Sequence, residues 1–192
     1  MKFQDGEVLT LDGTQYRVEN YVGRGAVSDV YRAWLLELQD APVILKFVRD
    51  DASGDLLKIE ALQREAETLT VLNRAEDPQW ARLTEAAARF RRAQETAQKR
   101  RVVALIDSGT LSPDEPVVVQ EVAPDALKRF DVASPVDELV MLSVAQGIVD
   151  VIVLAHHHDL ALKDFEPATK GDRIRLRWLD DSRQSFDLKI ID

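Results

Sequence analysis

The chain has 192 residues, of which 45% are hydrophobic and 31% charged, which excludes a globally disordered protein and fits one domain or two small lobes. The formal net charge of -9 argues against nucleic acid as the main partner, because such binding depends on Lys and Arg contacts to phosphate. The absence of cysteine excludes disulfides, thiolate zinc sites and a cysteine nucleophile.

No membrane partner is expected from the sequence. The N-terminal residues carry acids and a glycine where a signal peptide needs an uninterrupted apolar stretch. The longest apolar segment, 136–155, contains Asp137, Glu138 and Asp150, so it does not qualify as a membrane span. We therefore expect a cytoplasmic protein.

The first fifty residues predict an antiparallel meander of strands. "TQYRVENYV" is followed by the turn "GRGA" and by "VSDVYRAWLLEL", and after a turn at Asp40 to Pro42 comes "VILKFV". From Asp55 to Asn73 the apolar residues recur at steps of three and four, which predicts an amphipathic helix. The residues on this stripe are Ile59, Leu62, Ala66 and Leu69.

A second helix is predicted at about 78–101, where Asp77 is a suitable cap and Pro78 suits a first turn. It carries seven basic residues, namely Arg82, Arg89, Arg91, Arg92, Lys99, Arg100 and Arg101, against Glu85 and Glu95. The basic surface is either a solvated helix face or a docking surface for an acidic partner. RNA binding is less favoured because there is no pattern of stacking aromatics.

Strands return at "RVVALIDSG" and "PVVVQEV", and a long apolar helix is predicted at about 136–157. A helix that is apolar on nearly all sides must be buried on nearly all sides. A loop at 160–173 and two strands over 174–191 close the chain. The predicted fold class is therefore α+β.

The glycine stretch "YVGRGAVSDVY" places Gly23, Gly25 and Ser28 between two strands. A Rossmann fingerprint must open a helix, so this position argues against one. A hairpin that needs positive φ would use glycine without any function. Alternatively, the strand–loop–strand arrangement resembles the phosphate-covering loop of protein kinases.

Lys46 and Glu65 extend this resemblance. Lys46 lies in "VILK" on the third strand, where the kinase family has its phosphate-pairing lysine, and Glu65 resembles the helical glutamate that pairs with it. The other interpretation is that both are ordinary surface charges. However, Lys46 lies in an apolar strand, where a charge needs a partner.

Later segments resemble the family in the same order. "PVVVQEVA" resembles the strand that leads into the interlobe hinge, with Gln120 as gatekeeper and the backbone of Glu121 to Ala123 at the adenine edge. Asp164 in "LALKDFEPATKGDRIRL" matches the catalytic aspartate, and Asp192 in "FDLKIID" matches the aspartate of the Asp-Phe-Gly motif. The chain is thus similar to the protein kinases, of the bacterial Ser/Thr type or a pseudokinase.

This resemblance implies a kinase-like N-lobe over 1–123 and part of a helical C-lobe over 124–192. The N-lobe would have a five-stranded antiparallel sheet, a helix of the αC type and the inserted helix at 78–101. The C-lobe part would hold the helix at 136–157, a catalytic-loop-like segment at 160–173 and the strand pair at 174–191. We expect a chain truncated at the Asp-Phe-Gly aspartate, with ATP and Mg²⁺ as cofactors.

The site residues that the resemblance implies fall into three groups. The catalytic group is Asp164, Lys46 and Glu65; the nucleotide group is Gly23, Gly25, Ser28, Val30, Ile44, Lys46, Gln120, Glu121 and Ala123; and the metal group is Asp192 with Thr169 or Asp172.

Several positions depart from the kinase pattern and favour a second hypothesis, a non-catalytic module that binds a partner with or without nucleotide. Ile44 replaces the alanine beside adenine and shares a strand face with Lys46, so it would intrude on the base. Leu162 and Lys163 replace histidine and arginine, and Glu166 brings an anion near the phosphates. A protein partner, a second copy or the missing remainder is expected to cover the helix at 136–157.

His156 to His158 do not predict a metal site. Adjacent side chains on a helix point about 100° apart, so three in a row cannot converge on one ion. Imidazolium groups at a helix C-terminus are also favourable for the helix dipole.

Overall fold

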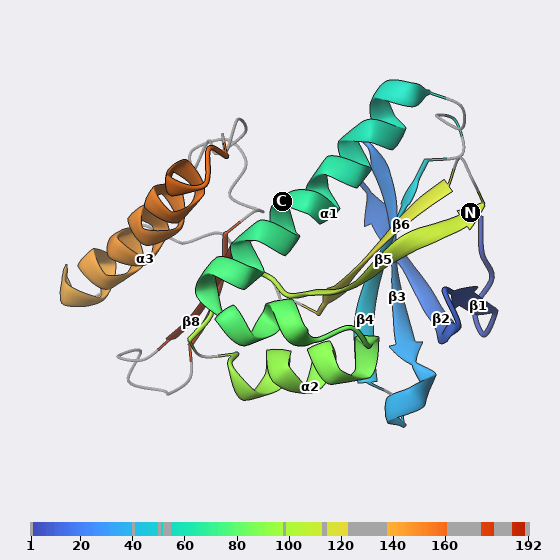
Figure 1. The fold of residues 1–192 in the computed structure, drawn as a ribbon, viewed down its shortest axis with the longest axis horizontal. Coiled ribbons are helices and arrows are strands. Elements are labelled where there is room, and N and C mark those ends of the chain that lie inside the picture. Colours follow the sequence, from blue (N-terminus) through green and yellow to red (C-terminus); the bar gives the residue numbers. More distant parts are fainter. Residues whose placement is uncertain are drawn as a thin grey trace. The chain divides into compact units, whose positions relative to one another are not determined.

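The computed structural model describes residues 2–39, 41–49, 51, 55–97, 99–112, 115–122, 138–160, 174–178 and 186–190 (Figure 1). The chain divides into two units. The first consists of Met1–Glu95 with Ala104–Val122, and the second of Thr96–Val103 with Ala123–Asp192.

The first unit is built on a six-stranded antiparallel sheet with the order β1-β2-β3-β4-β6-β5. Its strands are β1 Val8–Leu11, β2 Thr14–Arg24, β3 Ser28–Leu35, β4 Ala41–Val48, β5 Leu105–Ser112 and β6 Glu115–Glu121. A short 3₁₀ turn, Leu36–Leu38, follows β3. The sequence predicted five strands, which was wrong because the sheet has six. The missed strand is β1.

The β1–β2 hairpin had a signal in the sequence. Asp12 and Gly13 form its two-residue turn with φ of 47° and 92°. Two consecutive positive φ values define the primed turn that matches the twist of paired strands, and Asp-Gly is a preferred sequence for it. The four-residue strand before the turn was too short for its alternation to stand out.

The core lies on one face of this sheet, as period-two alternation requires. In β3 and β4 every second side chain is buried, including Tyr31, Ala33, Val43, Leu45 and Phe47. The sheet is barrel-like, because its two edge strands, β1 and β5, approach each other. Gly109 on β5 allows this approach: a Cβ there would lie 3.0 Å from Leu11 Cδ1 and 2.4 Å from Asp12 Oδ2.

Helix α1, Leu56–Glu76, packs on the other face of the sheet against β4, β5 and β6 (Figure 1). It begins after Asp55, whose carboxylate caps it by accepting from the Leu57 N–H at 3.1 Å. Its buried side chains are Ile59, Leu62, Leu69, Leu72 and Asn73. Strand β6 is consequently buried on both faces, by the core on one and by α1 on the other.

The single helix predicted at 78–101 was wrong. The segment forms a 3₁₀ turn, Pro78–Arg82, and then helix α2, Ala86–Glu95. Asp77 caps the turn by accepting from the Gln79 N–H at 3.0 Å, and Leu83 interrupts the helix with extended dihedrals of -90° and 114°. Trp80 and Phe90 still reach the core of the first unit, as the apolar stripe predicted.

In the second unit, helix α3 spans Glu138–His157, and β7 Ile174–Trp178 pairs antiparallel with β8 Phe186–Ile190. Val144, Val151 and Ala155 of α3 are buried, whereas Leu142, Val149 and Val153 are exposed. The helix therefore has an exposed apolar side in the single chain. Its expected cover by a partner, a second copy or the remainder stays a prediction. None of the helices in the described ranges is long and apolar enough to span a membrane.

Candidate functional site

The two charges singled out by the resemblance to protein kinases, Lys46 and Glu65, form an ion pair. Lys46 projects from the middle of β4 and Glu65 from the middle of α1. Their side chains are 14% and 20% exposed, so both are largely removed from water. The interpretation as unrelated surface charges is thereby wrong, while their catalytic role stays a prediction.

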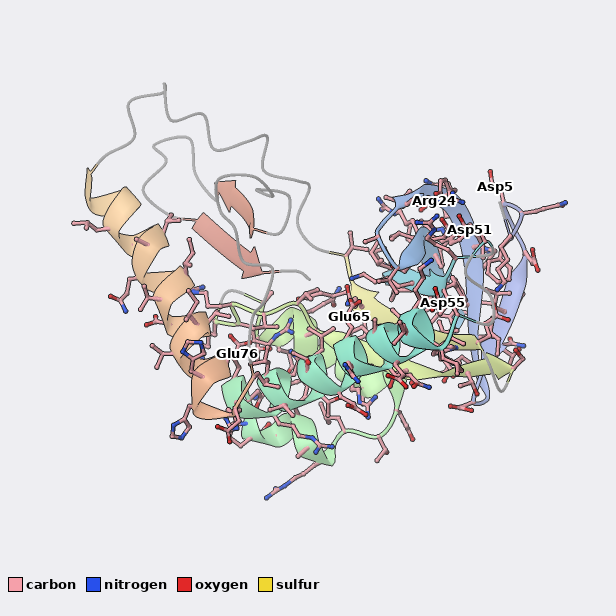
Figure 2. The ribbon with its side chains drawn as sticks, turned by 90° about the horizontal axis from the view of Figure 1, so that it is seen from above. Asp5, Arg24, Asp51, Asp55, Glu65 and Glu76 are labelled. Atoms are coloured by element: carbon pink, nitrogen blue, oxygen red, sulfur yellow. The ribbon has the colours of Figure 1, made fainter. Side chains whose placement is uncertain are left out.

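Glu65 interrupts the buried stripe of α1. It lies between Leu62 and Leu69, on the side of the helix near β6 (Figure 2). A carboxylate at this position needs polar partners, because burying a charge without them is costly. Besides Lys46, its second partner is Gln120, whose Nε2 donates to Glu65 Oε1 at 2.7 Å.

The C-terminal part of α1 is tied to the sheet by a buried amide. Asn73 is 0% exposed, and its Oδ1 accepts from the Leu105 N–H at 2.7 Å. Together with the contacts of Glu65, this bond fixes α1 to the sheet at two places along its length. The helix therefore presents Glu65 to Lys46 from a defined position.

The glycine hairpin and Lys46 lie in one row across the sheet. Gly23 pairs with Val30, Val30 pairs with Lys46, and Lys46 pairs with Val118. Directly opposed residues in a sheet share a face, and neighbouring strands are about 4.8 Å apart. The end of the hairpin therefore lies about 10 Å, or two strand spacings, from Lys46 on the same face of the sheet.

The two glycines of the hairpin are not explained by the fold. Neither has a positive φ, so the expectation of a turn that needs glycine is not met. A Cβ at Gly23 would meet nothing within 4 Å, and one at Gly25 would make ordinary contact with Ser28. Among the described residues, nothing requires the absence of a side chain at Gly23.

A group of charged residues holds the hairpin, and the sequence analysis missed it. Asp29, only 5% exposed, accepts from Tyr21 Oη at 3.2 Å and from Arg24 Nε at 3.1 Å. Arg24 Nη1 lies 3.7 Å from Asp51 Oδ2, and Asp51 forms a second ion pair with Arg49 (Figure 2). The hydrogen bond from Arg49 lowers the pKa of the Asp51 carboxyl, which keeps it ionised in this group.

The backbone joins the hairpin to the end of β4. The Gly25 N–H donates to the Ser28 carbonyl at 2.7 Å, which closes the turn, and the Arg49 N–H donates to the Val27 carbonyl at 3.3 Å. The loop is thus held beside the end of the strand that carries Lys46.

The residues expected around an adenine base are only partly described. Val30 and Ile44 are half-buried, and Ile44 pairs with Gln120 in the row next to Lys46. The Glu121 N–H donates to the Ala104 carbonyl at 2.9 Å, and its carboxylate accepts from the Ala104 N–H at 3.0 Å. Glu121 is therefore bonded to Ala104 through both its backbone and its side chain.

The remaining site residues that the resemblance implied lie outside the described residues. These are Asp164, Thr169, Asp172 and Asp192, together with Ala123 at the hinge. The histidines at 156–158 are described and exposed. Within the described ranges, no group of three or more His, Cys, Asp or Glu residues could hold a metal ion.

A second polar region lies where the β1–β2 turn, the start of α2 and β5 meet. It is an open cavity of about 720 Å³ whose lining includes Asp12, Glu37, Glu85, Arg89 and Asp107. Tyr16 Oη donates to Asp107 Oδ2 at 2.8 Å, and burial raises the pKa of the Asp107 carboxyl. The sequence did not predict this region, because its members are far apart along the chain.

Some basic residues of the inserted segment form hydrogen bonds or ion pairs within the fold, and others lie on the surface. Arg92 pairs with Asp77 at 2.5 Å, Arg89 Nε donates to the Leu83 carbonyl at 2.9 Å, and buried Arg100 donates to Thr96 Oγ1 at 3.0 Å. Arg91 is exposed. The predicted docking surface for an acidic partner is therefore smaller than the count of basic residues indicated.

Comparison with known protein families gives no matching model, and no curated protein sequence matches the chain.

Proposed function

We propose that this chain binds ATP in the manner of a protein-kinase N-lobe, and that its parent activity is phosphoryl transfer from ATP with Mg²⁺ to a protein serine or threonine. The observation that carries the proposal is the ion pair between Lys46 on β4 and Glu65 on α1. In phosphoryl transfer by kinases, such a pair directs the lysine ammonium at the nucleotide phosphates.

The order of the elements supports the proposal. The glycine hairpin joins β2 to β3, Lys46 follows on β4, and α1 comes next in the chain and packs over the face that carries Lys46. The β1 strand and the insertion at 78–95 are additions to this arrangement. Neither lies in the cross-strand row that joins Gly23 to Lys46.

The described residues fit the phosphate half of a nucleotide. ATP would supply the phosphoryl group. Lys46 would provide a positive charge facing its phosphates, and Glu65 would orient that ammonium. The space above Gly23 allows the hairpin backbone to come close to a ligand, a common reason for glycine at such a position. We propose Asp164 as the acceptor of the hydroxyl proton, and Asp192 with Thr169 or Asp172 as the metal ligands.

A thermal-shift titration tests nucleotide binding. ATP at 100 times its Kd stabilises the folded state by about 2.7 kcal/mol. For a chain of this length that corresponds to a rise in Tm of about 5 to 10 °C. We expect this rise with ATP and Mg²⁺, and a smaller one both with ATP alone and in Lys46→Met. Lys99→Met, at an exposed site, is the matched control and should keep the full rise.

A second candidate function is a non-catalytic module that binds another protein. Ile44 favours it, because a branched side chain beside Lys46 reduces the room for a base on that face. The exposed side chains Leu142, Val149 and Val153 also favour it, since they give α3 an apolar stripe. If millimolar ATP causes no shift in Tm, the proposal of ATP binding fails and the protein-binding module remains.

A further inference from the structure

Gln120 is a buried amide in an otherwise apolar stretch. It follows Val117–Val119 on β6 and is 3% exposed. Buried polar side chains nearly always have hydrogen-bond partners, because an unsatisfied amide loses its contacts with water and gains nothing in return. The partner here is a carboxylate oxygen on another element, Glu65 Oε1.

Three elements converge on that oxygen. Lys46 Nζ reaches it from β4, Gln120 Nε2 reaches it from β6, and Glu65 itself extends from α1. Lys46 and Gln120 lie on neighbouring strands and one row apart, since Lys46 pairs with Val118 and Ile44 pairs with Gln120. The carboxylate is therefore held by two donors that approach from adjacent strands.

The two donors differ in what they contribute. A lysine ammonium is a point charge on a flexible four-carbon stem, so it attracts a carboxylate without fixing its direction. The Gln120 amide starts from a strand that is buried on both faces, so its position is set by the sheet. Lys46 thus supplies the charge, and Gln120 supplies the direction.

We propose that Gln120 is a positioning residue of this site: its side-chain amide holds the Glu65 carboxylate toward β4, where it meets Lys46, and so sets the rotation of α1 about its own axis. The consequence for nucleotide binding rests on the proposed function. The effect on α1 is independent of it.

Amide hydrogen exchange of the ligand-free protein tests the effect on α1. Gln120→Met keeps the length of the side chain and removes the donor. We expect the backbone amides of 62–69 to exchange about 10- to 150-fold faster, the range that corresponds to one lost hydrogen bond to a charged group. Gln63→Met makes the same replacement at an exposed position of the same helix and should leave these rates unchanged.

Two outcomes of the exchange measurement would overturn the proposal. One is an unchanged rate over 62–69 in Gln120→Met. The other is an acceleration of equal size in every strand and helix of the first unit, which would mean only a loss of global stability. If Gln120→Met does not fold, Gln120→Asn, one methylene too short to reach Glu65, should give the same local acceleration.

Nucleotide titration supplies the second measurement. Gln120→Met should weaken ATP binding about tenfold more than it weakens adenosine binding, because only the phosphates meet Lys46. Equal losses for ATP and adenosine, or no loss for ATP, would refute positioning. A wild-type chain that binds no ATP would refute the proposed function instead, and the exchange result would still decide the role of Gln120.

Discussion

Gly23 is a glycine that the described fold does not require. Its φ is not in the left-handed region, and a side chain would meet no atom within 4 Å. Gly23 lies in one cross-strand row with Val30 and Lys46. Under the proposed function it has a different role, because a ligand at Lys46 would extend along this row toward the hairpin. On this view, the glycine leaves space for a ligand and does not serve the backbone.

This role makes Gly23→Ala an informative substitution. Alanine at a conformationally compatible glycine stabilises a protein by about 0.4–1 kcal/mol, since it restricts the unfolded chain. We therefore expect a slightly higher free energy of unfolding, measured by urea denaturation. ATP affinity should fall about 5- to 150-fold, as overpacking by about 1–3 kcal/mol implies. A loss of stability with unchanged ATP affinity would show that Gly23 serves the hairpin itself.

The pair of Lys46 and Glu65 shows how much a sequence can reveal about a site. A lysine inside an apolar strand requires a partner, and the resemblance to protein kinases assigned Glu65 as that partner. The contribution of Gln120 could not be predicted in this way. Its amide meets a carboxylate 55 residues away, and only the strand order β4-β6 brings the two together.

At the scale of elements, local signals predicted most of the first unit. Alternation located β2 to β6, and steps of three and four residues located α1. The predicted helix at 78–101 failed because the basic and apolar residues fit a helical period, whereas the extended backbone of Leu83 divides the segment. The curvature of the sheet was not predictable, because it depends on Gly109 meeting a turn nearly a hundred residues earlier.

In the inserted segment, charges that hold the fold together can be distinguished by substitution from charges that lie on the surface. Arg92→Glu places a carboxylate against Asp77, which is 6% exposed, and we expect a clear drop in the urea midpoint. Arg91→Glu, the adjacent and exposed control, should leave the midpoint nearly unchanged. An equal drop in both would contradict the assignment of Arg92 to the fold. A docking surface for an acidic partner is therefore best tested at Arg91.

At the scale of the whole molecule, the described residues to which the proposal assigns nucleotide binding lie in the first unit. The hairpin, Lys46, Glu65 and Gln120 belong to the first unit. The residues proposed for proton transfer and metal binding belong to the second. Nucleotide binding, and not turnover, is therefore the part of the proposal that concerns the described residues most directly.

A buried ion pair is weak evidence of stabilisation, because replacing both charges with apolar residues often leaves stability unchanged or higher. Stability alone therefore does not account for the pairing of Lys46 with Glu65, and the proposed function assigns the pair to a ligand. The central claim is that this ligand carries phosphate and meets Lys46.

Calorimetric titration of ATP and of adenosine into the wild-type chain and Lys46→Met tests this claim most directly. Loss of a hydrogen bond from a charged group costs about 1.5–3 kcal/mol. We therefore predict that ATP affinity falls about 10- to 150-fold in Lys46→Met, while adenosine affinity stays within about twofold. Equal ATP affinity in the two proteins, or no ATP binding to the wild type, would contradict the claim.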